Sequence, residues 1–230
     1  MVETAVERTG PRGRFISFEG GEGSGKSTQI RLLAQRLQAD GQQVVVTREP
    51  GGSPGAEIIR HLLLSGMGKL LGPEAETLLF AAARDDHVRS VIAPALSQGR
   101  FVLCDRFTDS TRVYQGRLGQ VAPALVHAMQ RVTIGDLQPD LTFILDVPVE
   151  IGLKRAALRR GTAAPDRFEA ELAQFHQELR EAYRQLAAAE PRRCVLIDAT
   201  AAPDVVASQV WTALRERRLI AGAEAVAHPA

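Results

Sequence analysis

The chain has 230 residues, of which 45% are hydrophobic and 24% are charged, and this composition is typical of one globular domain with a buried core. Its 28 basic and 27 acidic side chains nearly cancel, which excludes a broad electrostatic surface for nucleic acid or membrane. No run of 18 apolar residues occurs, and residues 1–14 lack an apolar segment, so we predict neither a membrane span nor a secretory signal. Cys104 and Cys194 lie in apolar runs and are expected to be buried free thiols, which favours a cytoplasmic location.

The alternation of apolar runs and helical segments predicts an α/β fold. Short apolar runs without clean alternation are typical of parallel strands that are covered on both faces. Five such runs occur, at 15–19, 44–48, 101–105, 141–147 and 194–198. We therefore expect an open parallel sheet of about five strands with helices on both faces. Residues 14–220 are assigned to this single domain, 1–13 to a flexible leader and 221–230 to a mobile tail.

Periodicity, proline and glycine indicate where several helices lie. Apolar residues repeat at helical spacing over 30–37, and Gly41 is a suitable stop after them. A second helical segment opens at Pro73 and is expected to be interrupted near Pro94. A long charged amphipathic helix is predicted over 167–189. Its apolar side is formed by Phe168, Leu172, Phe175, Leu179, Tyr183 and Leu186.

Residues 20–27 (GGEGSGKS) match the phosphate-loop pattern G-x-x-x-x-G-K-[ST]. Glycines let successive backbone N–H groups face phosphate oxygens, and the following helix adds a positive dipole end. Lys26 is expected at the β- and γ-phosphates and Ser27 at Mg²⁺. A chance glycine-rich turn is the competing interpretation, and the preceding strand and following helix argue against it. We predict that ATP is bound by Gly20, Gly21, Glu22, Gly23, Ser24, Gly25, Lys26, Ser27 and Thr28.

The end of the third predicted strand helps to choose among the proteins that use such a loop. A GTPase needs an N-K-x-D segment, and the sequence has none. A hydrolytic ATPase places an acid at this strand end to hold Mg²⁺ and water. Asp105 stands there, but Arg106 follows directly, and an arginine suits a substrate phosphate better than a hydrolytic water. We therefore predict a P-loop kinase that transfers the phosphoryl group to an acceptor.

Several short strings resemble the signature set of the thymidylate kinase family. They are FEG at 18–20, TREPGG at 47–52, LFAAAR at 79–84, DRF at 105–107, YQG at 114–116, PDL at 139–141 and LDV at 145–147. They occur in the family's order and spacing over residues 14–200. The resemblance implies an enzyme that transfers the γ-phosphoryl group of ATP to dTMP with Mg²⁺, giving dTDP and ADP in dTTP synthesis. It also implies a homodimer packed through helices such as residues 73–90.

On the phosphate side of the acceptor, the resemblance implies roles for Arg48, Asp105 and Arg106. Arg48 ends the second predicted strand, which we place beside the first strand, where ligands of open parallel sheets gather. Arg48 would bind the dTMP phosphate, and Arg106 would bridge that phosphate toward the γ-phosphoryl group. Asp105 would help Ser27 to hold Mg²⁺ through water. Taken without the resemblance, residues 48–52 are more often a surface turn, and an ordinary surface ion pair is the competing interpretation of Asp105 and Arg106.

On the base side, the resemblance implies a further five residues. Phe80 and Arg84 are four residues apart on a predicted helix, so both face the same way. Phe80 would stack on thymine, although such a residue alone is more often core, and Arg84 would donate to a base oxygen. Thr111 and Gln115 would hydrogen-bond the thymine edge. Tyr114 would lie beside the sugar C2′.

A basic segment that loosens into small residues predicts a lid near 155–166. Some thymidylate kinases place an arginine in the phosphate loop, whereas the bacterial type supplies it from the lid. The matching loop position here is Gly23, which implies the lid type. Glu22 is expected to orient the lid or the acceptor sugar. For the basic segment, the alternative interpretation is a charged helix face that is only solvated. The lid arginines are Arg155, Arg159 and Arg160, of which the last two are predicted to be catalytic at the γ-phosphate.

Three other classes share part of this pattern. A deoxynucleoside kinase has a similar loop but needs a carboxylate base for a neutral hydroxyl, and Arg48 favours an acceptor that is already anionic. A nucleotide-dependent switch or partner-binding ATPase would consume ATP without an acceptor, and no base-specific or sensor motif supports it. Adenylate- and guanylate-type kinases differ at Phe80 and in residues 47–52.

Overall fold

The computed structural model describes residues 12–162 and 168–220. Most of the predicted leader, the end of the predicted lid and the predicted tail therefore lie outside the described residues. Five parallel strands form one sheet in the order β2-β3-β1-β4-β5. Their bounds are β1 Phe15–Glu19, β2 Val44–Arg48, β3 Phe101–Asp105, β4 Leu141–Asp146 and β5 Cys194–Asp198. All five predicted strands are confirmed, and β4 ends one residue early because Pro148 cannot continue a ladder.

The strand order corrects one prediction about Arg48. We placed the second strand beside the first, but β3 lies between β2 and β1. The order of parallel strands is determined by the crossover connections, and the residue pattern of each strand does not encode it. Arg48 still reaches the same edge of the sheet, because it is in register with Asp105 of β3.

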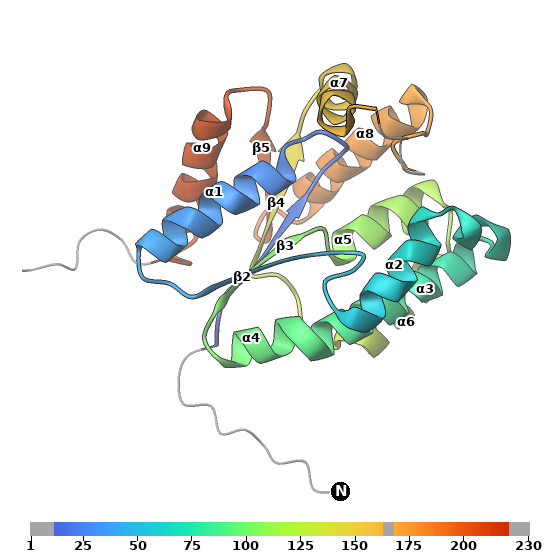
Figure 1. Ribbon diagram of the computed structural model, residues 1–230, viewed down its shortest axis with the longest axis horizontal. Coiled ribbons are helices and arrows are strands. Elements are labelled where there is room, and N and C mark those ends of the chain that lie inside the picture. The colour runs from blue at the N-terminus through green and yellow to red at the C-terminus, as the bar shows by residue number, and fades with distance from the viewer. Residues whose placement is uncertain (1–11, 163–167, 221–230) are drawn as a thin grey trace, which may run out of the picture.

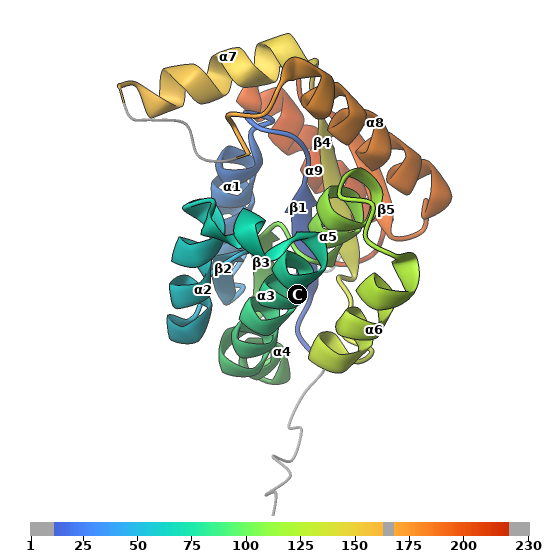
Figure 2. The same cartoon turned by 90° about the vertical axis from the view of Figure 1, so that its right-hand side faces the viewer.

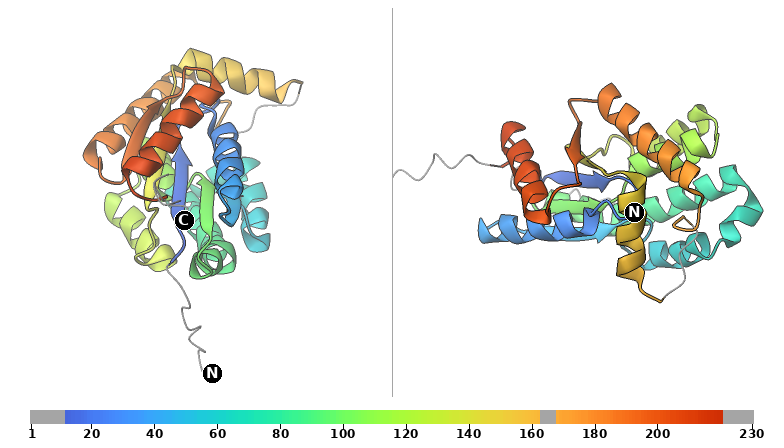
Figure 3. Two further views of the ribbon diagram at one scale, coloured as in Figure 1. Left: turned by 90° about the vertical axis from the view of Figure 1, so that its left-hand side faces the viewer. Right: turned by 90° about the horizontal axis from the view of Figure 1, so that it is seen from above.

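One face of the sheet is covered by α1 (Lys26–Ala39) and α9 (Pro203–Glu216). Leu33 and Leu37 of α1 pack into one cluster with Phe18, Phe143 and apolar residues of α9. Both helices lie on the same side of the strands in Figure 1, and they stand in front of the strands in the left view of Figure 3. The predicted helical period over 30–37 is thus confirmed as the buried side of α1.

The other face is covered by helices that follow β2, β3 and β4. Val88 and Ile92 pack with Phe15 and Phe107, while Leu179 and Tyr183 join a second cluster around Ile144. The elements that supply this layer are α3 Pro73–His87, a π-helical stretch Val88–Ile92, α4 Ala93–Ser97, α5 Thr108–Thr111, a π-helical stretch Arg112–Leu118 and α8 Ala173–Ala189. The remaining helical elements are α2 Pro54–Leu64, a 3₁₀ stretch Met67–Leu71, α6 Pro123–Ile134 and α7 Val149–Arg160.

Two helix predictions are refined by the structure. The interruption expected near Pro94 is the π-helical stretch just before it, because proline has no N–H to continue the α-helical ladder. The predicted start of the 167–189 helix is wrong, since α8 begins at Ala173. Leu172 continues the helical spacing in sequence, but its backbone is extended and its side chain is 79% exposed.

Two predictions made from composition can be compared with the described residues. Cys104 and Cys194 are buried free thiols, as expected. Among the residues that the structure describes, no helix combines the length and the apolar character needed to cross a membrane.

Candidate active site

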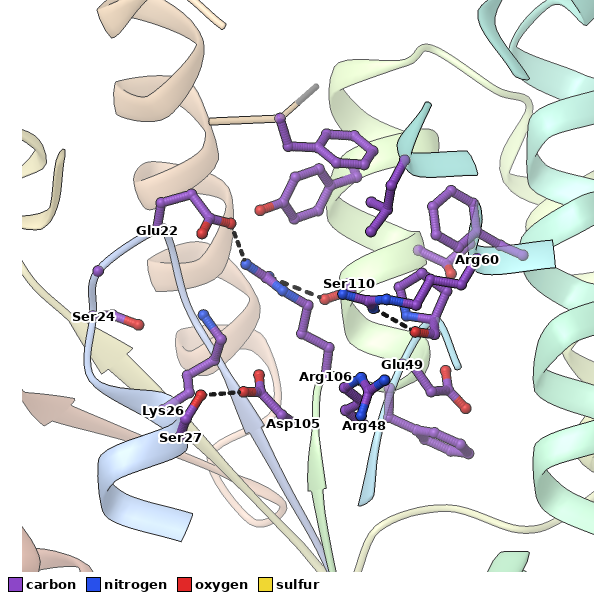
Figure 4. Close-up of a pocket in the computed structure, with 18 of the residues that line it drawn as sticks. Glu22, Ser24, Lys26, Ser27, Arg48, Glu49, Arg60, Asp105, Arg106 and Ser110 are labelled. Carbon is purple, nitrogen blue, oxygen red and sulfur yellow. Dashed lines mark hydrogen bonds and ion pairs between the residues drawn. The ribbon is translucent and has the colours of Figure 1, made fainter. Parts of the chain in front are cut away.

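The carboxyl ends of three neighbouring strands meet at one edge of the sheet. Arg48 of β2 is in register with Asp105 of β3, and Asp105 is in register with Phe18 of β1. The phosphate loop follows β1 directly, and α7 lies above this edge (Figure 2). A pocket of about 350 Å³ opens here and is lined by residues of the phosphate loop, β2, β3 and α7, among others (Figure 4).

The phosphate loop has the backbone that its glycines permit. Gly20, Gly23 and Gly25 have φ values of 133°, 65° and 94°, a region that residues with a Cβ rarely adopt. Lys26 begins α1 and donates from Nζ to the carbonyls of Gly20 and Gly21, each at 3.1 Å. Burial, together with the nearby charge of Arg106, lowers the pKa of Lys26. The loop therefore holds a sequestered cation at the N-terminus of a helix, and both favour a bound anion.

Gly23 and Gly152 lie against each other, which gives a physical reason for the glycine at loop position 23. A Cβ on Gly23 would overlap the Gly152 carbonyl of α7, and a Cβ on Gly152 would lie 2.5 Å from the carbonyl oxygen of Glu22. The loop consequently cannot carry an arginine here without displacing α7. The sequence analysis missed Gly152, whose only signal was a glycine inside a helical segment.

Ser27 and Asp105 form the predicted metal-binding pair. The Ser27 Oγ donates to Asp105 Oδ2 at 2.9 Å, so a hydroxyl and a carboxylate oxygen already lie together. Such oxygen ligands suit Mg²⁺, which usually keeps several waters and binds substrate phosphates. Within residues 12–162 and 168–220, no cluster of three or more His, Cys, Asp or Glu could hold a metal. The pair therefore fits a metal whose other ligands are phosphate and water.

Arg106 occupies the centre of the pocket, between the loop and the predicted base site. Its backbone is left-handed, with φ 70°. Its Nη2 donates to Glu22 Oε1 at 2.7 Å, and its Nη1 donates to the Tyr183 hydroxyl at 3.3 Å (Figure 4 shows the Glu22 contact). The guanidinium also lies 5.2 Å from the centroid of the Tyr114 ring. Burial by itself raises the pKa of Glu22. The positive charges of Arg106 and then Lys26 outweigh burial and hold that pKa below its ordinary value.

A fully buried acid, Glu19, lies behind Arg106. Its Oε1 accepts from the backbone N–H groups of Phe107 and Ser110, and its Oε2 accepts from the Ser110 and Tyr183 hydroxyls. Burial, followed by the nearby charge of Asp109, raises the pKa of Glu19 to about 7. Sequence reasoning treated Glu19 only as part of a signature string, because nothing in the sequence shows that these hydroxyls converge on it.

The predicted base-side residues are brought together by α3, α5 and the π-helical stretch. Arg84 Nη2 donates to Thr111 Oγ1 at 3.0 Å, and Gln115 Nε2 donates to Glu76 Oε1 at 3.1 Å. Phe80 and Tyr114 line the same pocket. Phe168 joins them edge-on to Tyr114, with ring centroids 5.3 Å apart. The sequence analysis had assigned Phe168 to a helix side.

The lid arginines have three different surroundings. Arg159 lines the pocket and donates to Glu169 Oε1 at 2.8 Å. Arg160 donates to Glu169 Oε2 at 2.7 Å and does not line the pocket. Arg155 donates to the carbonyls of Ala199 and Thr200, after β5. The described geometry therefore brings Arg159, and neither of the other two, to the predicted site.

Comparisons with known proteins identify the family. A family model described as thymidylate kinase matches residues 18–210. The chain belongs to the thymidylate kinase family. It is 72% identical over 219 residues to the thymidylate kinase of Bradyrhizobium diazoefficiens, covering 95% of this chain and 96% of that protein. It is also 72% identical over 229 residues to that of Rhodopseudomonas palustris (strain BisB18), covering 99% and 100%.

A solved structure supports the thymidylate kinase fold. The crystal structure of thymidylate kinase from Ehrlichia chaffeensis matches with a TM-score of 0.71 and 33% identity, covering 89% of this chain and 100% of that chain. The resemblance stated from the signature strings is thereby confirmed. The deoxynucleoside kinase, adenylate- or guanylate-type kinase and nucleotide-switch alternatives give way to the thymidylate kinase family.

Most predicted site residues line the pocket, with three exceptions. Gly20 and Gly21 of the loop do not line the pocket and accept from Lys26 through their carbonyls, and Arg160 donates to Glu169 instead. Arg48 lines the pocket with a half-exposed side chain that donates to Glu57 at 2.8 Å. Additional lining residues to which the sequence analysis gave no site role are Glu49, Pro50, Arg60, Leu64, Phe107, Ser110 and Phe168. Arg60 and Leu64 were missed because α2 itself was not predicted.

Proposed function

We propose that this pocket holds ATP and dTMP together and that the family's reaction runs across Arg106. As a thymidylate kinase, the enzyme phosphorylates dTMP to dTDP at the expense of ATP. The observation that supports this arrangement most directly is the position of Arg106. It contacts Glu22 of the phosphate loop on one side and Tyr114 of the base-side group on the other.

On the donor side, the phosphate loop binds the ATP phosphates. The backbone N–H groups from Gly20 to Thr28 face the β-phosphate region, and Lys26 transfers its contacts from loop carbonyls to phosphate oxygens. Ser27 and Asp105 would hold Mg²⁺ with the nucleotide. The ion supplies charge neutralisation on the β- and γ-phosphates.

On the acceptor side, Arg48 and Arg106 bind the dTMP phosphate. Thymine stacks on Phe80, and its edge meets Arg84, Thr111 and Gln115, with Tyr114 beside the sugar. An oxygen of the dTMP phosphate attacks the γ-phosphorus while the bond to the ADP oxygen breaks. No general base is needed, because the attacking oxygen is already anionic.

The lid supplies the cation that arrives with the substrates. We infer a lid near 155–166 that carries Arg159 to the γ-phosphoryl group, since Arg159 already lines the pocket. Positive charge placed where the transferred group develops charge stabilises the transition state, and such contacts are worth orders of magnitude in rate. Glu22 keeps Arg106 aimed until the acceptor phosphate arrives.

We also propose that the enzyme is a homodimer in the cytoplasm. Large apolar side chains are exposed on packed neighbours α2, α3 and α6, among them Ile58, Leu78 and Val132. Exposed apolar surface of this kind is typical of protein interfaces. A cytoplasmic location suits an enzyme that uses ATP.

One assay tests the proposed function. ADP and dTDP formation would be measured with ATP, Mg²⁺ and a panel of monophosphates. We expect kcat/KM to fall in the order dTMP, then dUMP, with dCMP, AMP and GMP near background. A methyl group separates thymine from uracil and is worth about 1–3 kcal/mol, so dUMP is tolerated. A higher kcat/KM for AMP or GMP than for dTMP would overturn the acceptor-site assignment.

A further inference from the structure

Behind the base-reading Arg84 lies a chain of buried polar side chains for which the reaction gives no direct role. Arg84 Nε donates to Glu49 Oε2 at 2.7 Å, and Glu49 Oε1 lies 3.1 Å from His87 Nδ1. His87 Nε2 lies 2.6 Å from Thr47 Oγ1. Arg84, Glu49 and Thr47 are each at least nine-tenths buried, and His87 is wholly buried.

The turn after β2 closes over this chain. Gly52 has a φ of 90°, and a Cβ there would lie 2.5 Å from both His87 Nε2 and Thr47 Oγ1. The polar chain thus joins α3, which carries Arg84, to the end of β2, where Thr47 and Arg48 lie, and to the turn that follows it. A fixed connection of this kind couples the base side of the acceptor pocket to its phosphate side.

The partners of Arg84 define which of its donors remains for a ligand. Nε is held by Glu49, and Nη2 donates to Thr111 Oγ1 and to the Phe107 carbonyl. In the described part of the chain, Nη1 has no hydrogen-bond partner, and Arg84 lines the pocket. The planar guanidinium is therefore held through Nε and Nη2, and the two N–H groups of Nη1 remain for the ligand.

We propose that Glu49 and His87 are positioning residues that set the specificity of the acceptor site for a keto pyrimidine. They hold the plane of the Arg84 guanidinium so that Nη1 donates to a carbonyl of thymine. Cytosine carries an amino group at the position of that carbonyl. This inference rests on the proposed placement of thymine in the pocket. A donor held rigidly opposite a second donor rejects cytosine, whereas a donor free to swing away tolerates it.

The decisive variant is Glu49→Gln, which keeps the size of the side chain and removes its charge. We expect the ratio of kcat/KM for dTMP to that for dCMP to fall about tenfold, the size expected for a weakened hydrogen bond to a charged group. The ratio for dTMP over dUMP stays unchanged, because both bases present the same carbonyl. The KM for ATP stays within twofold of the parent.

A structural role alone would lower the activity toward dTMP and dCMP equally, so an unchanged dTMP/dCMP ratio in Glu49→Gln overturns the inference. His87→Gln gives a second, independent variant should Glu49→Gln fail to fold, and the same ratio is expected to fall. Asp85→Asn is the matched control, since Asp85 lies on the same helix and, among the described residues, forms a surface ion pair with Arg89. Its ratio should equal the parent's.

A double variant shows whether Glu49 acts through Arg84. Glu49→Gln combined with Arg84→Ala should have the same ratio of kcat/KM for dTMP over dCMP as Arg84→Ala alone. Without the Arg84 guanidinium, the change at Glu49 has no side chain left to misplace. Additive losses would contradict the inference. If the unmodified enzyme shows no preference for dTMP over dCMP, the proposed placement of thymine is wrong and this inference falls with it.

Discussion

Among the described residues, the Lys26 ammonium group donates its hydrogen bonds to carbonyls of its own loop, those of Gly20 and Gly21. Because these contacts build no apolar core, Lys26→Ala should leave thermal unfolding nearly unchanged. Loss of a cation aimed at developing charge should lower kcat by about 10²–10³. Steady-state kinetics with dTMP, alongside circular dichroism, would test this. Activity within threefold of the parent would sink the assignment of the loop.

Glu19 gives a prediction about pH and stability. Its pKa rises to about 7 in the folded chain from the ordinary value of 4.5, so the folded state binds a proton that the unfolded state has released between these values. Stability contributed by this group is therefore present below pH 4.5 and is lost as pH rises to 7, by on the order of 3 kcal/mol.

Glu19→Gln should remove that part of the pH dependence, because the amide cannot ionise. Urea unfolding of parent and variant from pH 4.5 to 7.5 measures the difference. As pH rises, we expect the free energy of unfolding of the parent to fall relative to that of the variant. A difference that does not change with pH would show that Glu19 stays ionised in the folded protein.

At the scale of elements, the C-terminal end of α7 places two adjacent arginines in different surroundings. Both pair with Glu169, but Arg159 lines the pocket and Arg160 does not. Arg159→Ala should lower kcat on the order of 10³-fold with little change in KM for dTMP. The reason is that the Arg159 guanidinium is proposed to stabilise the charge of the phosphoryl group in the transition state. Arg160→Ala should have a smaller effect on kcat. Equal effects, or a change in KM alone, would contradict a catalytic role for Arg159.

The elements also show what a sequence can and cannot predict. The strands were predicted correctly because buried parallel strands are short, apolar and bounded by turn residues. The start of α8 was not, because Phe168 and Leu172 keep the helical spacing while Phe168 packs on Tyr114 and Leu172 is exposed. Strand order was misjudged for β2, since it depends on crossovers between segments that are distant in sequence.

At the scale of the whole molecule, exposed apolar residues on α3 give a test of the proposed dimer. Leu78 is about half exposed in the single chain, so Leu78→Glu should leave folding intact. A charge buried in a dimer interface is costly, and the variant should therefore elute as a monomer in size-exclusion chromatography with light scattering. A variant that stays dimeric would show that the copies pack elsewhere.

Across the molecule, the sequence predicted the residues that line the pocket better than those that lie behind them. Lys26, Arg84 and Arg106 stand in recognisable strings, and they line one pocket. Glu19, His87 and Gly152 were missed, because their partners come from distant segments and only the folded chain brings them together. Short sequence patterns therefore predict residues that line the pocket, whereas the residues behind them become visible only when distant segments are brought together by folding.

The lining of the pocket has a kinetic consequence. In the described part of the chain, six lysine or arginine side chains line it against three carboxylates, while the whole chain carries a formal charge of only +1. Positive potential is thus focused in one depression of an almost neutral molecule, and anions are drawn toward it during diffusion. Added salt screens that attraction beyond about 8–10 Å. Capture of the two nucleotides should slow in concentrated salt, while phosphoryl transfer inside the filled pocket keeps its rate.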